Sequence, residues 1–80
     1  MQIEIASTAE FGSVVKKVRK SCGIIQRETA FLAGVSPPFL NKLERGGIAV
    51  HLGKVIQVCQ SLGIKIILEL PENFEGESNG

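Results

Sequence analysis

Aromatic residues are scarce in this 80-residue sequence, which has no tryptophan, no tyrosine and only four phenylalanines. Proteins that bind single-stranded nucleic acid stack bases on exposed aromatic rings, so the composition argues against that class. No apolar run approaches the roughly 20 residues that cross a bilayer, and no basic segment precedes an apolar one at the N-terminus. We therefore expect a cytoplasmic protein with neither a membrane span nor a signal peptide.

Cysteine and histidine are also rare. Cys22 and Cys59 are the only thiols, His51 is the only imidazole, and there is no C-x-x-C motif. Neither a zinc site nor a redox motif has its ligands, and we expect both cysteines to be reduced core residues. The sequence also has no pair of carboxylates on one face and no glycine-rich phosphate loop, so it predicts no enzyme, no cofactor and no metal.

Charge is divided unevenly along the chain. Residues 1–68 hold nine basic and four acidic side chains, a net charge of +5, whereas residues 69–80 hold four glutamates and no base. Seven of the bases fall between positions 16 and 45: Lys16, Lys17, Arg19, Lys20, Arg27, Lys42 and Arg45. A basic middle favours a surface that faces phosphates, although charge alone is explained equally well by a solvated helix face.

Helical periodicity and capping residues predict most of the fold. Ser7 and Glu10 have the spacing of a capping box, and apolar residues follow at helical spacing up to Gly23. A short helix is expected over residues 26–33, and another after a loop through residues 50 and 51. The residues expected to face the core are Phe11, Val14, Val15, Val18 and Cys22 in the first helix and Leu52, Val55, Ile56, Cys59 and Leu62 in the last.

The stretch GVSPPFLNKLERG, residues 34–46, begins a helix with two prolines. Ser36 is a suitable N-cap, worth about 1 kcal/mol. Pro37 and Pro38 occupy the first two helical positions, whose amides lack intrahelical partners in any case. A polyproline recognition segment is the alternative, but Phe39 and the leucines after it continue at helical spacing. The prolines therefore predict a helix whose start is fixed.

Two segments alternate apolar and polar residues, which is the pattern of a half-buried strand. In residues 2–6 the apolar face carries Ile3 and Ile5, and in residues 64–70 it carries Ile64, Ile66, Leu68 and Leu70. An unpaired apolar strand would leave both an edge and a face exposed, so we expect a two-fold homodimer. Residues 1–70 are predicted to form one domain, followed by a disordered acidic tail over residues 71–80.

Two short helices joined by the turn GVS have the geometry in which the second helix lies in a major groove. The residues at the spacing of this motif are Gln26, Ala30, Gly34, Val35, Leu40 and Leu43. On these residues and on LERG at positions 43–46, the chain resembles the phage-repressor/Cro-like (XRE) helix-turn-helix family over roughly residues 9–63. The resemblance implies a mainly α, lambda-repressor-like bundle of four to five helices, with a salt bridge between Arg19 and Glu44.

The segment IKIILEL directly after the last helix resembles the HipB-type subgroup of that family. This resemblance implies a C-terminal strand that joins two subunits in an intersubunit sheet, to which residues 2–6 are a candidate addition. It also implies a dimeric repressor of a palindromic double-stranded operator, acting as the antitoxin of a HipA-like kinase toxin. Two alternatives remain: a protein-interaction module that neutralises such a toxin and binds DNA weakly, and a stand-alone XRE-type regulator without a toxin.

The same resemblance implies which residues contact DNA: Gln26, Arg27, Ser36, Pro37, Pro38, Asn41, Lys42 and Arg45. Asn41 suits adenine and Lys42 suits guanine or a phosphate, whereas the two prolines offer only apolar contact, for instance to a thymine methyl. Gln26 resembles the family's phosphate clamp, with Arg27 and Arg45 as additions. For Arg27 and Lys42, a solvent-exposed helix position without a ligand is the alternative.

Three features depart from the family pattern. The first is the proline pair at positions 37 and 38, where family members often read bases with Gln, Arg or Lys, and the other two are single residues. Ile25 stands where the family often has a capping threonine, and Thr29 stands where it usually has a leucine. Both changes are expected to weaken the helix over residues 26–33 without altering the turn that follows it.

Overall fold

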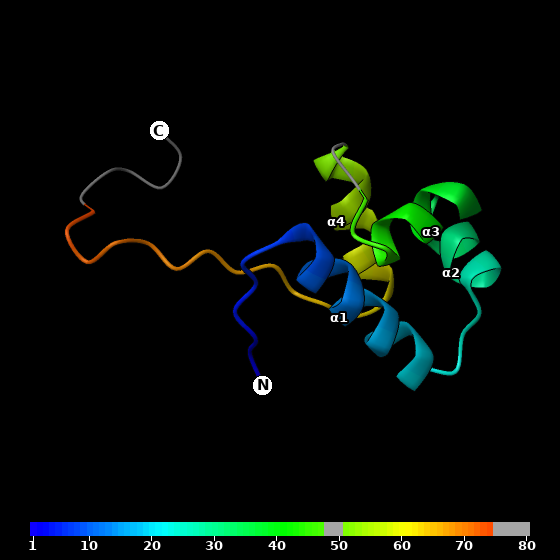
Figure 1. Cartoon of the computed structure of the whole chain (residues 1–80), viewed down its shortest axis with the longest axis horizontal. Helices are drawn as coiled ribbons and strands as arrows, with labels where there is room; N and C mark the ends of the chain where they lie inside the picture. Colours follow the sequence, from blue (N-terminus) through cyan, green and yellow to red (C-terminus); the bar gives the residue numbers. More distant parts are fainter. Residues whose placement is uncertain (48–50, 75–80) are drawn as a thin grey trace.

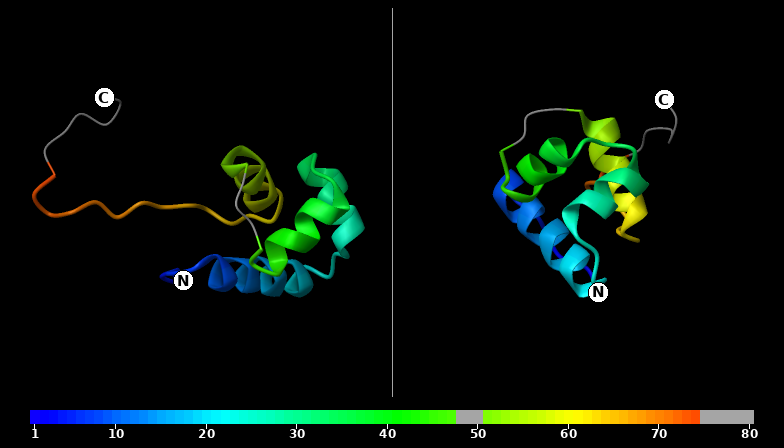
Figure 2. Two further views of the ribbon diagram at one scale, coloured as in Figure 1. Left: turned by 45° about the horizontal axis from the view of Figure 1, so that its top comes forward. Right: turned by 90° about the vertical axis from the view of Figure 1, so that its right-hand side faces the viewer.

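The structure is a computed structural model that describes residues 1–47 and 51–74. Its helices are α1 (Thr8–Ser21), α2 (Gln26–Ala33), α3 (Pro37–Glu44) and α4 (Leu52–Ser61). They gather at one end of the molecule, while residues 64–74 run away from them as an extended trace (Figure 1). α1 packs on α3, and α2 packs on both α3 and α4, as the turned views also show (Figure 2). The expected mainly α bundle is confirmed.

α1 and α3 begin at the N-cap residues that the sequence predicts, Ser7 and Ser36. The Ser7 hydroxyl accepts a hydrogen bond from the Glu10 amide at 3.1 Å, and the Glu10 carboxylate accepts one from the amide of Ala6 at 2.7 Å. At α3 the Ser36 hydroxyl accepts from the Phe39 amide at 3.2 Å, with the two prolines at the first and second helical positions. Each cap satisfies an amide that the helix itself leaves unpaired.

α2 lacks local stabilising hydrogen bonds at Ile25 and Thr29, the two residues of this helix that depart from the family pattern. Ile25 has the extended backbone of an N-cap, but its side chain makes no capping hydrogen bond. Thr29 is buried, and its hydroxyl oxygen has no hydrogen-bond partner among the described residues. An unpaired buried polar group costs about 1–3 kcal/mol, so α2 depends on its packing against α3 and α4.

The core lies between the four helices and includes Val35, the middle residue of the turn after α2. Its buried apolar residues are Val15, Ala30, Ala33, Val35, Leu40, Leu43, Val58, Cys59 and Leu62. Ala30 is fully buried on the side of α2 that packs on α3 and α4. Leu40 and Leu43 are buried, so their side of α3 faces the core and the opposite side faces solvent.

The strands expected over residues 2–6 and 64–70 are not formed in this chain, and no strand is assigned within residues 1–47 and 51–74. A strand needs the backbone of a neighbour, and a bundle of four helices offers none. Residues 2–6 and 65–70 stay exposed, and Leu68 keeps 80% of its surface open to solvent, whereas Ile64 is half-buried against the core. Residues 75–80 of the expected acidic tail lie outside the described residues, as does residue 50 of the expected loop.

Three residues assigned to the core from periodicity are exposed instead. Cys22 is the C-cap of α1, one residue beyond its last turn, and it lies at the surface. Leu52 and Ile56 are exposed on α4, because the buried side of that helix runs through Val58 and Cys59. Both cysteines are free, and burial raises the pKa of the Cys59 thiol, which keeps it protonated and unreactive.

α1 and α3 touch through their backbones at Gly12, which is buried. A β-carbon at position 12 would meet the carbonyl oxygen of Leu43 and would lie 2.9 Å from the carbonyl carbon of Glu44. These are backbone atoms of α3, which a side-chain rotation cannot move. Only glycine therefore allows the two helices to approach this closely.

We expect Gly12→Ala to lower the free energy of unfolding by about 1–3 kcal/mol in urea titrations, because the added methyl group forces α1 away from α3. Gly53→Ala is the matched control, since a β-carbon at Gly53 in α4 would meet nothing within 4 Å. Alanine is the better helix former by about 1 kcal/mol, so the control should be neutral or stabilising. Equal effects of the two variants would contradict the proposed role of the close contact.

Candidate nucleic-acid interface

α2 and α3 are joined by a turn of three residues. Gly34 takes the left-handed conformation, with φ 76° and ψ 28°, and ends α2. The amide of Val35 donates to the carbonyl of Ala30 at 3.0 Å, and the Val35 side chain is buried beneath the turn. Ser36 then caps α3. The turn is therefore held by backbone bonds and a buried anchor, which fixes the angle between the two helices.

The eight candidate DNA-binding residues lie on α2, α3 and the residues that flank α3. Ser36, Pro37 and Pro38 are exposed at the start of α3, and Lys42 and Arg45 are exposed further along. Asn41 is half-buried on the same helix. The remaining two residues, Gln26 and Arg27, form the first turn of α2, where Gln26 is half-buried and Arg27 is exposed.

An ion pair beneath this surface connects α1 to α3. Arg19 Nε lies 2.6 Å from Glu44 Oε2, and Arg19 Nη2 donates to Glu44 Oε1 at 2.9 Å. Arg19 Nη1 also donates to the carbonyl of Ile24 at 2.8 Å, in the loop before α2. Both charged residues are buried. The salt bridge expected from the family resemblance is confirmed.

A chain of side-chain hydrogen bonds leads from this ion pair to the surface. Gln26 Nε2 donates to Glu44 Oε1 at 2.9 Å, Asn41 Nδ2 donates to Gln26 Oε1 at 3.4 Å, and Arg45 Nη1 donates to Asn41 Oδ1 at 3.4 Å. Each amide group carries two N–H donors, so each retains one for a ligand. This hydrogen-bond chain was not predicted from the sequence. Only the step from Asn41 to Arg45, four residues apart on one helix, has a local spacing that reveals it.

The two charges of the ion pair stabilise each other. Hydrogen bonding to Glu44 raises the pKa of Arg19, against the opposing effect of burial. Burial favours the protonated form of Glu44, but hydrogen bonds from Arg19 and Gln26 and the charges of Arg19 and Lys16 together lower the pKa of Glu44 below its usual value. The pair therefore remains charged at neutral pH.

Lys54 is a further basic residue beside the candidate interface, and the sequence analysis did not identify it. Its ammonium lies 5.8 Å from the ring centre of Phe39, in the first turn of α3. A cation over an aromatic face is attracted by about 0.5–1 kcal/mol at an exposed site. Lys54 comes from α4, so no sequence spacing predicts that it lies beside Phe39.

We expect the stability of the protein to fall at acid pH partly through Glu44. Its pKa is lower in the folded than in the unfolded chain, so the unfolded chain binds more protons once the pH falls below about 4.3. The stabilisation from Glu44 is thus present above that pH and is lost as the pH falls through the folded pKa. Urea titrations at a series of pH values measure the effect.

Two variants isolate the contribution of the pair in that experiment. Glu44→Gln leaves the charge of Arg19 buried and unpaired, so it should cost about 3–5 kcal/mol at neutral pH and flatten the acid dependence. Replacing both partners, Arg19→Met with Glu44→Leu, removes the unpaired charge and should recover most of the loss. A Glu44→Gln variant as stable as the parent at neutral pH would contradict this account.

Two helices joined by a fixed three-residue turn, the second one exposed along a polar and basic side, define a helix-turn-helix protein. Residues 15–68 match the helix-turn-helix family HTH_3, and the chain belongs to that family. No helix in the described part of the chain is long and apolar enough to cross a membrane. The described residues also contain no group of three or more histidine, cysteine or acidic residues that could hold a metal ion.

Two curated relatives carry the name HTH-type transcriptional regulator. The chain is 39% identical over 71 residues to an uncharacterized HTH-type transcriptional regulator, y4mF, of Sinorhizobium fredii, covering 89% of this chain and 93% of the relative. It is 31% identical over 67 residues to the HTH-type transcriptional regulator SlrR of Bacillus subtilis. That match covers 84% of this chain but 42% of SlrR, so the chain spans less than half of that relative.

Solved structures share the same fold. The restriction-modification controller protein C.AhdI of Aeromonas hydrophila superposes with a TM-score of 0.67 at 28% identity, covering 72% of this chain and 84% of C.AhdI. A HipA–HipB–O2–O3 complex gives a TM-score of 0.78 at 22% identity, covering 89% of this chain and 100% of the matched chain. At 22% identity the second similarity shows the fold alone.

Proposed function

We propose that the protein is a sequence-specific DNA-binding transcriptional repressor whose reading element is α3. The observation that carries this proposal is the position of α3 in the bundle. Its inner side is buried at Leu40 and Leu43, its last turn is tied to α1 by the Arg19–Glu44 pair, and its outer side is exposed and basic. Two relatives, y4mF and SlrR, carry the name HTH-type transcriptional regulator, which supports the regulatory part of the proposal.

The proposed contacts divide into base reading and backbone positioning. Ser36, Pro37 and Pro38 enter the major groove first, where the prolines suit thymine methyl groups. One turn later along α3, Asn41 contacts adenine and Lys42 contacts guanine or a phosphate. Phosphate contacts come from Gln26, Arg27 and Arg45, which flank this turn of α3.

We expect Asn41→Ala and Lys42→Ala to weaken binding to a DNA site selected from a random-sequence pool. Loss of a base contact should cost about 1–3 kcal/mol at one position of the site, whereas loss of a phosphate contact should weaken all sequences and flatten the salt dependence. Titrations at several salt concentrations separate the two results. Lys65→Ala is the control, because it removes the same charge outside α2 and α3.

The result of that titration decides between DNA reading through α3 and the protein-interaction alternative. Unchanged affinity at fixed salt in a variant that carries both Asn41→Ala and Lys42→Ala would show that α3 is not the reading helix. The protein-interaction alternative would then be preferred, since the two prolines offer DNA no hydrogen-bond donor.

The proposed active form is a homodimer joined through residues 64–70. In the single chain this segment is extended, and Ile66, Ile67, Leu68 and Leu70 are exposed. Pairing with a second chain would satisfy its backbone and bury its alternating apolar side. A two-fold dimer would present two copies of α3 to half-sites about 34 Å apart, or a multiple of that distance, on a pseudo-palindrome. In this arrangement residues 1–70 act as one domain and residues 71–80 as an acidic tail.

We expect Leu68→Lys to convert the dimer to a monomer in sedimentation experiments at micromolar concentration, because it places a charge on the buried side of the sheet. Ile67→Lys is the matched control, since residue 67 lies on the opposite side of the alternating segment and should tolerate the charge. A parent chain that sediments as a monomer, or a Leu68→Lys variant that stays dimeric, would argue against this interface.

We further propose that the repressor is the antitoxin of a HipA-like kinase toxin. The segment over residues 64–70, which resembles that of the HipB-type subgroup, motivates this narrower proposal, and the fold shared with the HipA–HipB–O2–O3 complex over 89% of this chain is consistent with it. The adjacent gene should then encode a kinase-like protein that co-purifies with this chain. An adjacent gene of another kind would favour a stand-alone regulator.

A further inference from the structure

The side chains that connect the buried ion pair to the surface of α3 donate in one direction. A carboxylate only accepts hydrogen bonds, so Glu44 Oε1 is matched by the Nε2 group of Gln26, at 2.9 Å. The other side of the Gln26 amide, Oε1, then accepts from Asn41 Nδ2 at 3.4 Å. A guanidinium only donates, and Arg45 Nη1 donates to Asn41 Oδ1 at 3.4 Å. We call the side chains of Glu44, Gln26, Asn41 and Arg45 the hydrogen-bond chain.

Charges at the two ends fix the orientation of both amides between them. The Glu44 side chain is only 1% exposed and is paired with Arg19, so it stays an acceptor. Reversing the Gln26 amide would turn its oxygen toward this carboxylate. Reversing the Asn41 amide would turn its NH2 group toward the Arg45 guanidinium and its oxygen toward Gln26 Oε1. Either reversal loses hydrogen bonds and sets like partial charges against each other, so the hydrogen-bond chain has one stable direction.

We propose that the hydrogen-bond chain makes Asn41 selective for adenine over guanine, with Gln26 and Arg45 as the positioning residues of its amide. The inference rests on the proposed function, in which α3 enters the major groove. The held amide of Asn41 has one N–H and one oxygen lone pair left. Adenine presents one acceptor and one donor in the major groove, which match this pair, whereas guanine presents two acceptors. An amide free to rotate could offer guanine both of its N–H groups.

The positioning role is compatible with the phosphate contacts proposed for Gln26 and Arg45. Gln26 keeps one N–H after donating to Glu44, and Arg45 keeps the remaining N–H groups of its guanidinium. The two roles predict different losses. Removing a phosphate contact weakens binding to every sequence, whereas releasing the amide of Asn41 changes the preference between two bases at one position of the site.

The first experiment compares affinity for a selected DNA site with affinity for the same site carrying guanine in place of adenine. The position tested is the one at which Asn41→Ala loses discrimination. Gln26→Met and Arg45→Met should lower the parent's preference for adenine by about 3- to 10-fold, since each variant removes one hydrogen bond that holds the amide. Methionine has a length similar to that of both side chains and donates no hydrogen bond.

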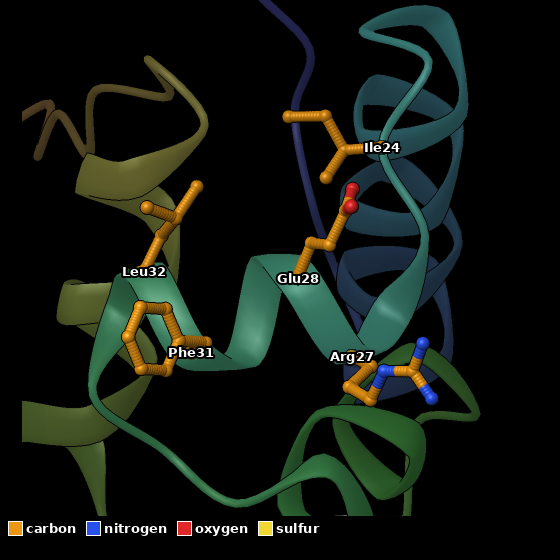
Figure 3. Close-up of a pocket in the computed structure, with 5 residues that line it drawn as sticks. All are labelled: Ile24, Arg27, Glu28, Phe31 and Leu32. Carbon is orange, nitrogen blue, oxygen red and sulfur yellow. The ribbon is translucent and has the colours of Figure 1, made fainter.

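Arg27→Met is the matched control for Arg45→Met. Both arginines are exposed and are proposed phosphate contacts, so the two substitutions remove the same charge. Arg27 lies outside the hydrogen-bond chain, on the side of α2 that borders an open hollow (Figure 3). The hollow is lined by Ile24, Arg27, Glu28, Phe31 and Leu32. Arg27→Met should weaken binding to both sites alike and leave the preference for adenine unchanged.

A second set of variants tests whether the effect acts through Asn41. In the Asn41→Ala background, Gln26→Met and Arg45→Met should weaken both sites alike and no longer change the preference. A change of preference that persists in this background would overturn the proposal. Unchanged preference in Gln26→Met and Arg45→Met, or an equal change in Arg27→Met, would overturn it as well.

The second experiment measures NMR relaxation of the Asn41 side-chain amide in the free protein. Its order parameter should be high in the parent and in Arg27→Met, and it should fall in Gln26→Met and Arg45→Met. An order parameter that is equal in all four proteins would overturn the proposal.

Because this measurement needs no DNA, it separates the two possible failures. A parent that selects no DNA site while its Asn41 amide is held would refute the proposed function, and the reading role with it. A parent that discriminates adenine from guanine while its Asn41 amide is mobile would keep the proposed function and refute this inference.

Discussion

The buried ion pair between Arg19 and Glu44 is the interaction on which the placement of the candidate DNA-binding helix depends. Arg19 belongs to α1 and also holds the carbonyl of Ile24, while Glu44 ends α3 and also holds Gln26 at the start of α2. One pair of side chains thus joins three helices. The cost of removing two charges from water offsets most of their attraction, so such a pair adds little net stability. Its value is geometric, because only one arrangement of the helices keeps every charge satisfied.

α3 is positioned at both ends by features that leave little freedom. At its end, the close approach of Gly12 sets the distance between α1 and α3 through backbone contact. At its start, the Ser36 cap and the two prolines set the direction of the chain. A surface fixed in this way loses little conformational entropy when a ligand binds. The polar side chains on it are fixed as well, because Gln26, Asn41 and Arg45 are hydrogen-bonded to one another.

Local signals in the sequence predicted the helices well, because caps and turns act over a few residues. Ser7, Ser36 and Gly34 stand where the structure begins or ends a helix, and residues 26–33 form α2 as expected. The buried side of α4 was predicted only in part. Ile56 has the periodicity of a core residue, but it is exposed because α4 packs mainly on α2. The strand over residues 64–70 stays a prediction, because it was expected to pair with a second chain and a single chain offers it no neighbouring strand. The contacts between Gln26 and Glu44 and between Lys54 and Phe39 join distant positions, and their residue types alone do not reveal them.

The distribution of apolar residues connects folding to assembly. Nine apolar side chains are buried among the described residues, while large ones stay exposed along residues 66–70 and at Phe31 and Leu32 of α2. A chain of 80 residues has a small core and a correspondingly small margin of stability. Any partner that binds only the folded chain adds to that margin by mass action. If the partner is a second copy and the DNA site binds dimers, the equilibria of folding, dimerisation and DNA binding are coupled. Occupancy of the operator then rises with the square of the chain concentration while monomers prevail, so a modest change in concentration becomes a larger change in repression.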